Sequence, residues 1–296
     1  MHAIEAHSLT KTYPGDIQAV KGVDFRVDPG EVFGLLGPNG AGKSTTVGML
    51  TTTIRPTTGH ALVGGYDVVE QPLGARRVSS VVFQEAVVDR SLTGRQNLEL
   101  HARLWGSGSP ARIKELGGAL GLSDLVDRPV STYSGGERRR LEIARALVSE
   151  PKVLFLDEPT VGLDPRIRHE LLDVIAGLRA GHELTILVTT HYLDEAQRLA
   201  DRVAIIHEGE VVALDSPRAL LERLGGEILE CRVDGDPHAA LAALRLKRLA
   251  SDDAFAVGAR VTVPLHGRAA AVISTREPTL DDVYLQLTGT ELMEAA

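Results

Sequence analysis

The chain has one cysteine, no long apolar run and no excess of basic charge, and each absence excludes a class of protein. The single cysteine, Cys231, rules out an intrachain disulfide and a metal site built from several thiolates. No apolar run approaches the roughly 18 residues of a membrane-spanning helix, so any membrane role must involve a partner. The formal net charge of −8 repels nucleic acid. The first residues, MHAIEAHSLTKTY, lack the profile of a secretory signal peptide.

What is present is the composition of an ordinary globular protein, with 296 residues, 43% hydrophobic and 24% charged. Four short apolar runs followed by helical patterns predict a mostly parallel, helix-covered α/β sheet; they span residues 31–37, 78–83, 152–157 and 184–190. Residues 92–150 are helical in pattern and read as an insertion into this sheet domain. A hairpin turning at Glu208-Gly209 adds an antiparallel edge, and a short helix starts after Ser216.

The glycines at 225–226 mark a predicted boundary between a domain at 1–224 and a small α+β domain at 225–296. In the second domain we expect strands at 227–233, 259–265 and 270–275 and helices at 237–246 and 278–287. We find no internal repeat.

The segment GPNGAGKST follows an apolar strand and opens a helix, and it matches the phosphate-binding pattern G-x-x-x-x-G-K-[ST]. Its glycines let backbone N–H groups point inward around the phosphates of a nucleotide. Lys43 neutralises phosphate charge, and the hydroxyl of Ser44 is an expected Mg²⁺ ligand. The predicted phosphate-contacting residues are Gly37, Pro38, Asn39, Gly40, Ala41, Gly42, Lys43, Ser44 and Thr45.

Five other residues complete the predicted site. Asp157 and Glu158 end a buried strand, at the sheet edge where open α/β proteins bind ligands. We expect Asp157 to hold Mg²⁺ and Glu158 to act as general base on water. His191 ends another strand and is expected to contact the γ-phosphate, while Gln84 is a candidate ligand of Mg²⁺ or of the attacking water. Tyr13 is a candidate platform for stacking adenine.

The stretch STYSGGERRRLEIARAL at 131–147 contains no obvious catalytic group. Leu141, Ala144 and Val148 repeat at helical spacing, so its second half predicts an amphipathic helix. Taken alone, it favours a loop with an N-cap, followed by three arginines, at 138–140, on a solvated basic face.

In order along the chain, Tyr13, GPNGAGKST, Gln84, YSGGE, LFLDEP, GLD and His191 resemble the nucleotide-binding subunit of ABC transporters, over about residues 1–220. The resemblance implies a P-loop ATPase in which two copies enclose two ATP molecules head to tail. It also implies that Ser134, Gly135 and Gly136 form the signature segment, which covers the γ-phosphate held by the other copy. Tyr133 and Glu137 depart from the Leu and Gln that usually flank this segment.

The same resemblance implies that Asp164 connects the two nucleotide sites and that Gln84 links the nucleotide state to a membrane permease through the helical insertion. The permease would hold the subunit at the cytoplasmic face of the membrane. The segments LTGRQNLELHARLWG and EPTLDDVYLQLTG are similar to those of bacterial exporters of the daunorubicin-resistance type.

Several alternatives are less consistent with the chain. It has no N/T-K-x-D segment for guanine, only one phosphate loop, and no sustained heptads of a DNA-repair ATPase. A regulatory nucleotide binder without hydrolysis, an importer, and a transporter of lipid, polysaccharide or ions stay open. We expect an Mg²⁺-dependent ATPase that dimerises on ATP and drives a separate exporter permease.

Overall fold

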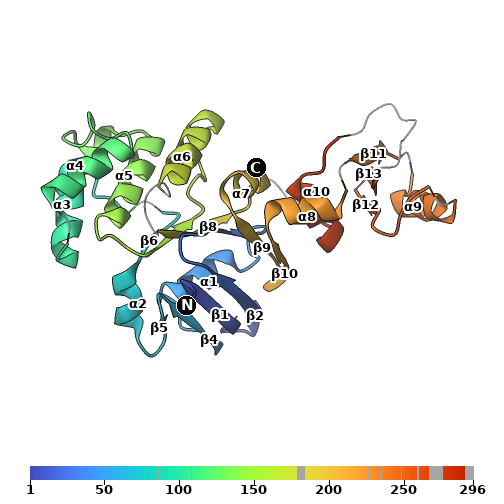
Figure 1. Ribbon diagram of the computed structural model, residues 1–296, viewed down its shortest axis with the longest axis horizontal. Helices are drawn as coiled ribbons and strands as arrows, with labels where there is room; N and C mark the ends of the chain where they lie inside the picture. Colours follow the sequence, from blue (N-terminus) through green and yellow to red (C-terminus); the bar gives the residue numbers. More distant parts are fainter. Residues whose placement is uncertain are drawn as a thin grey trace.

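The computed structural model describes residues 1–85, 87–107, 109–178, 184–225, 227–233, 235–247, 249–258, 260–266 and 276–290. A block of helices lies at one end of the molecule, two sheets lie in the middle, and a small unit near the C-terminus forms the other end (Figure 1). None of the helices in these ranges combines the length and the apolar character that a membrane crossing requires.

A six-stranded, mostly parallel sheet forms the centre, in the order β10-β9-β3-β8-β7-β6. Its strands are β3 (Val32–Leu36), β6 (Ser79–Val82), β7 (Val153–Asp157), β8 (Thr185–Thr190), β9 (Arg202–His207) and β10 (Glu210–Asp215). The first four coincide with the predicted apolar runs, and β3, β7 and β8 are buried along their whole length, as strands covered on both faces are. The antiparallel β9–β10 hairpin turns at Glu208 and Gly209, both with positive φ, which confirms the predicted antiparallel edge.

A second, antiparallel sheet has the order β2-β1-β4-β5. It comprises β1 (Ile4–Tyr13), β2 (Ile17–Val27), β4 (Thr58–Val63) and β5 (Tyr66–Asp67), and α2 (Pro72–Val78) follows it. Side chains of α1 (Lys43–Leu50), among them Val47 and Leu50, share one apolar core with Val23 of this sheet and with Phe33 and Phe155 of the central sheet. This shared core fixes the helix that follows the phosphate loop between the two sheets.

The helical block contains α3 (Gly94–Trp105), α4 (Pro110–Ala119), a short 3-10 helix (Val130–Thr132), α5 (Gly135–Leu147) and α6 (Pro165–Gly177). Residues 92–107 and 109–150 contain no strand, as the pattern predicts. Leu141, Ala144 and Val148 are buried in its core, together with Leu98 and Leu120.

One expectation for this block is wrong: the three arginines of α5 do not form a solvated face. Arg138 and Arg140 are partly exposed, but Arg139 is only 7% exposed. Its guanidinium donates to backbone carbonyl groups at the ends of β6 and β7 and to the Glu142 carboxylate of its own helix.

The remaining helices and strands are α7 (Leu193–Leu199), α8 (Pro217–Arg223), β11 (Ile228–Arg232), α9 (Pro237–Leu246), β12 (Phe255–Val257), β13 (Arg260–Pro264) and α10 (Leu280–Thr288). Ser216 caps α8 as expected, since its hydroxyl accepts from the backbone of Ala219 at 3.1 Å. The strands form a small antiparallel sheet, β11-β13-β12. The strand expected at 270–275 lies outside the described residues, and β12 was not predicted.

The helix α10 packs on the central part of the molecule rather than on the small sheet alone. Leu280, Val283 and Tyr284 share an apolar core with Leu193 of α7 and Leu220 of α8. The hydroxyl of Tyr284 lies 2.8 Å from the Nδ1 atom of His207, on β9. The boundary at 225 stays a prediction, but the chain beyond it returns to the first domain through α10.

Candidate functional site

The phosphate loop connects β3 to α1, and its glycines are required by the backbone around it. A Cβ atom at Gly37 would lie 2.2 Å from the carbonyl oxygen of Ile206. At Gly42, φ is +106° and a Cβ atom would lie 2.4 Å from the oxygen of Ala19. Because α1 begins at Lys43, directly after the loop, its first N–H groups have no partners within the helix and are available to an anion.

The side chain of Lys43 lies under the loop and is 3% exposed. Its ammonium donates to the carbonyl oxygens of Gly37 at 2.8 Å and Pro38 at 3.1 Å. It also lies 3.0 Å from Oε1 of Glu158, which is itself 6% exposed. Each buried charge is thus balanced by the other, as buried charges require.

Beside this ion pair lie oxygen atoms suited to a magnesium ion. The hydroxyl of Ser44 donates to Oδ1 of Asp157 at 3.2 Å. Thr189, on the adjacent strand β8, donates to the same carboxylate oxygen at 2.6 Å and accepts from the backbone N–H of Glu158 at 2.9 Å. No cluster of three or more His, Cys, Asp or Glu side chains that would suit a metal exists within the described ranges. One carboxylate and one hydroxyl match Mg²⁺, which takes its other ligands from waters and substrate phosphates.

The ring of His191 completes this group at the carboxyl end of β8. Its Nδ1 atom lies 3.4 Å from Oε2 of Glu158, and the ring is 7% exposed. Among the described residues, neither ring nitrogen has a hydrogen-bond partner. Buried polar atoms are normally paired, so these two nitrogens leave bonding capacity for a ligand such as a phosphate oxygen or water.

A second set of side chains, which was not predicted from the sequence, bonds to residues next to Glu158 and His191 in the chain. The carboxylate of Glu195 on α7 is 1% exposed. It accepts from the hydroxyls of Thr160 at 2.5 Å and Thr190 at 2.8 Å. Burial raises the pKa of Glu195. Glu195 therefore ties the loop after Glu158 to the residue before His191.

The other two predicted residues of this site are placed differently. Tyr13 lies beside the loop, with its hydroxyl 3.5 Å from that of Thr45. Gln84 follows β6 and is exposed. Among the described residues, Gln84 makes no hydrogen bond to Ser44 or Asp157, so its role at the metal stays a prediction.

Ser134, Gly135 and Asp164 are exposed, and Gly136 is buried. They lie at the starts of α5 and α6, two helices of the helical block (Figure 1). Ser134 caps α5, and Glu137 accepts from the Ser134 N–H at 2.7 Å, a bond that lowers the pKa of Glu137. Asp164 caps α6 by accepting from the N–H of Ile167 at 3.1 Å. A Cβ atom at Gly136 would lie 2.3 Å from Cγ2 of Ile167. The start of α5 is thus packed against the start of α6.

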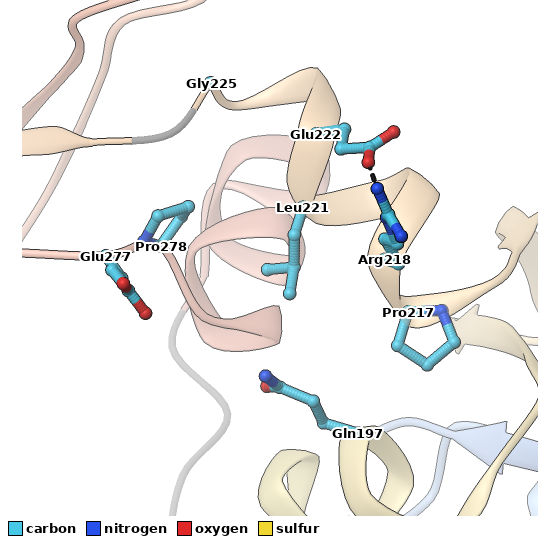
Figure 2. Close-up of a pocket in the computed structure, with 8 residues that line it drawn as sticks. All are labelled: Gln197, Pro217, Arg218, Leu221, Glu222, Gly225, Glu277 and Pro278. Atoms are coloured by element: carbon cyan, nitrogen blue, oxygen red, sulfur yellow. Dashed lines mark hydrogen bonds and ion pairs between the residues drawn. The ribbon is translucent and has the colours of Figure 1, made fainter.

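A cavity of about 500 Å³ lies elsewhere, between α7, α8 and the segment that leads into α10 (Figure 2). The residues that line it are Gln197, Pro217, Arg218, Leu221, Glu222, Gly225, Glu277 and Pro278. None of them belongs to the phosphate loop or to the residues around Glu158, so this cavity is not the nucleotide site.

Comparisons with known proteins show the family of the chain. The family model described as ABC transporter matches residues 20–161. The daunorubicin/doxorubicin resistance ATP-binding protein DrrA of Streptomyces peucetius is 44% identical, over 97% of this chain and 92% of that protein. Nod factor export ATP-binding protein I of Rhizobium meliloti (strain 1021) is 39% identical, over 99% of this chain and 90% of that protein.

Solved structures show the same fold. The chain matches cbiO1 from Clostridium perfringens, part of the ABC transporter complex cbiONQ, with a TM-score of 0.69 and 26% identity, over 83% of this chain and 95% of that one. It matches the ATP-binding cassette MJ0796, a dimer bound to ADP and Pi, with a TM-score of 0.65 and 26% identity, over 72% of this chain and 98% of that one. The chain therefore belongs to the ABC transporter family, as one of the ATP-binding subunits that hydrolyse ATP.

Proposed function

We propose that the chain is the Mg²⁺-dependent ATPase subunit of an exporter, which closes as a head-to-tail homodimer on two ATP molecules and drives a separate membrane permease from the cytoplasmic face. One observation carries this proposal. The chain holds one group of buried polar side chains around Lys43 and Glu158, and a second group at Ser134–Gly136, of which Ser134 and Gly135 are exposed, in a different part of the fold. Each group is one half of a site.

The first half-site binds the nucleotide. The N–H groups of the loop and the ammonium of Lys43 meet the phosphates, and Tyr13 stacks on the adenine. Ser44 and Asp157 would hold Mg²⁺, with Gln84 as the third expected ligand. An ion held there would neutralise charge on the phosphates.

Hydrolysis is assigned to Glu158 and His191. When the phosphates take Lys43 as their counter-charge, the Glu158 carboxylate loses its 3.0 Å partner and is available to accept a proton from water. The adjacent His191, with two unbonded ring nitrogens, orients that water or the γ-phosphate.

The second half-site covers the γ-phosphate of the ATP that a second copy of the chain holds. Ser134 presents its hydroxyl and the first N–H groups of α5, a helix end suited to an anion. Asp164, adjacent at the start of α6, is proposed to connect the two nucleotide sites. The dimeric state of the cassette MJ0796 bound to ADP and Pi supports such an arrangement.

The permease is proposed to contact the groove between the end of β6 and α3. A cavity of about 210 Å³ there is lined by Phe83, His101, Trp105 and Arg145, among others. Leu104 and Trp105 on α3 are 76% and 42% exposed. Burial and the charge of Arg145 lower the pKa of His101 to about 4, so its ring is neutral near pH 7. An amphipathic cytoplasmic helix of the permease fits this apolar, partly polar groove.

A drug-like or lipophilic compound is the proposed cargo, because several relatives are named for daunorubicin or doxorubicin resistance. Another relative is named for export of Nod factor, so a different exported substrate is the second candidate. A regulatory ATP-binding role without transport is the third, and it predicts no ATPase activity that depends on a permease.

The test compares the wild type with Glu158→Gln and Lys43→Ala, each co-expressed with the permease of the neighbouring reading frame. Glu158→Gln is expected to bind ATP, to hydrolyse it at least about 100-fold more slowly, and to accumulate as an ATP-bound dimer in gel filtration. Lys43→Ala removes the ammonium under the loop and is expected to lose ATP binding.

Two results would contradict the proposal. Glu158→Gln that hydrolyses ATP normally, or stays monomeric at saturating ATP, would remove the enclosed-dimer mechanism. Unchanged ATP affinity in Lys43→Ala would remove the phosphate loop as the nucleotide site.

A further inference from the structure

Arg139 uses all of its donors inside the protein, in a helix whose other arginines are partly exposed. Its guanidinium donates from Nε to the carbonyl oxygen of Pro159 at 2.8 Å. From Nη2 it donates to the carbonyl oxygens of Asp157 at 3.0 Å and Glu158 at 3.3 Å. From Nη1 it donates to Phe83 and Glu142. Such complete use of five donors is the condition under which a buried guanidinium is tolerated.

These bonds connect three segments that have separate roles in the proposed function. Arg139 lies on α5, three residues after Gly136 of the signature segment. Two of its acceptors, on Asp157 and Glu158, are the backbone of the predicted Mg²⁺ ligand and general base. A third is the carbonyl oxygen of Phe83, directly before Gln84.

Glu142 completes the connection to the Gln84 segment. Its carboxylate is 3% exposed and lies 3.0 Å from Nη1 of Arg139. Its other oxygen accepts from the backbone N–H of Val87 at 2.7 Å. The segment around Gln84 is therefore held to α5 on both sides, at Phe83 and at Val87.

The backbone at Glu158 explains why such a contact is needed. Its φ is +44°, a left-handed conformation that costs energy for a residue with a side chain. Strained residues of this kind persist where the surrounding structure over-determines them. Arg139 helps to fix this conformation of Glu158, because it donates to the carbonyl groups of Asp157, Glu158 and Pro159. The hydroxyl of Thr189 accepts from the Glu158 N–H.

We propose that Arg139 is a positioning residue that transmits the contact of the signature segment with the partner's nucleotide to the general base and the Gln84 segment of its own chain. The inference rests on the proposed enclosed dimer. A shift of α5 on closure moves the guanidinium, and with it the peptide groups that aim Glu158. The two ATP sites of the dimer thereby become cooperative, since each chain contributes to both.

The experiment compares wild type, Arg139→Met, Arg139→Lys and Arg140→Lys, each co-expressed with the permease. Arg140 is the matched control, because it lies on the same helix and its guanidinium donates a hydrogen bond to Glu170 of α6. The measurements are ATP affinity without Mg²⁺, kcat, and the Hill coefficient for ATP.

Arg139→Met is expected to keep the ATP affinity of the wild type, since Arg139 does not contact the phosphate loop. Its kcat is expected to fall about 10- to 100-fold, the cost of a misplaced catalytic group. Its Hill coefficient is expected to fall from the wild-type value toward about 1, as the two sites lose their coupling. Arg139→Lys, with three donors and no planar fork, is expected to be intermediate. Arg140→Lys is expected to match the wild type.

Other results distinguish a failure of this proposal from a failure of the proposed function. Wild-type kcat and Hill coefficient in Arg139→Met overturn the proposal, as does a loss of kcat that only follows the folded fraction measured by circular dichroism. If Arg139→Met does not fold, wild-type values in Arg139→Lys overturn it equally. A wild type without ATPase activity, beside Glu158→Gln that never dimerises, means instead that the proposed function itself is wrong.

Discussion

At the scale of single residues, the buried carboxylate of Glu195 has a consequence for stability that can be measured. Burial raises its pKa above the ordinary value, and the bonds from Thr160 and Thr190 and the charge of Arg168 offset part of that increase. The folded protein therefore binds this proton more tightly than the unfolded chain does. Between the ordinary pKa of about 4.3 and the raised pKa, the native state carries more protons, so its stability falls as pH rises.

We expect Glu195→Gln to lack this pH dependence, because an amide does not ionise. The melting temperature of the wild type minus that of Glu195→Gln should fall as pH rises from about 4 through the raised pKa, and then become constant. Scanning calorimetry of both proteins in the same buffers measures this difference. The contributions of the other carboxylates to the pH dependence cancel in it. A difference that is constant across the whole range would show that Glu195 titrates alike in the folded and unfolded states.

The residues of the site differ in whether a local sequence pattern could predict their roles. Lys43, Ser44 and Asp157 were predicted because loop spacing and strand ends fix their places, and the structure brings them together. Thr189 and Arg139 were not, because their importance comes from contacts with residues far away in the sequence. A threonine inside an apolar run carries no sign of the carboxylate that it bonds, and one arginine of three carries no sign of burial.

At the scale of helices and strands, buried parallel strands were predictable and small exposed ones were not. The strand β7 is a short, continuous apolar run that ends in a carboxylate, and its length together with the phosphate loop favours a buried strand. By contrast β12 has three residues and, within the described part of the chain, pairs with β13 alone, so tertiary contact rather than local pattern decides its conformation. The docking of α10 was also not foreseen, since a helical pattern shows that a face is apolar without showing what covers it.

The contact of α10 with the ATPase part predicts a measurable stability. Tyr284 is 1% exposed and bonds to His207. Tyr284→Phe should lower the free energy of unfolding by about 1 kcal/mol through the lost hydrogen bond. Tyr284→Ala should lower it by about 3–5 kcal/mol through the lost packing as well. Urea unfolding followed by circular dichroism measures both changes.

The control for this measurement is Leu287→Ala, on the same helix at 45% exposure. It should change the free energy by less than about 0.5 kcal/mol, as substitutions at exposed positions do. Equal effects of Tyr284→Ala and Leu287→Ala would mean that α10 is not held on the ATPase part in solution.

At the scale of the whole molecule, the proposed permease groove lies between the Gln84 segment and the helical block. Arg139 and Glu142 join that segment to α5, and Phe83 both accepts from Arg139 and lines the groove. A helix seated there contacts the same segment that the guanidinium holds. The proposed coupling therefore runs from the nucleotide to the permease through a few buried contacts.

This arrangement predicts that the exposed apolar side chains of α3 serve the permease and not the ATPase chemistry. Leu104→Asp places a charge on an exposed position of α3, directly before Trp105, which lines the groove. It should reduce co-purification of the permease at least about 10-fold, the scale of an interface hot spot. ATP binding and ATP-dependent dimerisation should not change, because Leu104 lies on neither half-site. Pull-down of the tagged pair from detergent extracts, with gel filtration of the subunit alone, measures both.

Leu246→Asp is the matched control, since Leu246 is 87% exposed at the end of α9, on the opposite end of the molecule (Figure 1). It makes the same chemical change without touching the groove, so the permease should co-purify as with the wild type. If Leu246→Asp loses the permease and Leu104→Asp keeps it, the small C-terminal sheet and α9 are the docking surface. The helical block would then act on the nucleotide alone, and the path through Arg139 would connect the two ATP sites without reaching the membrane partner.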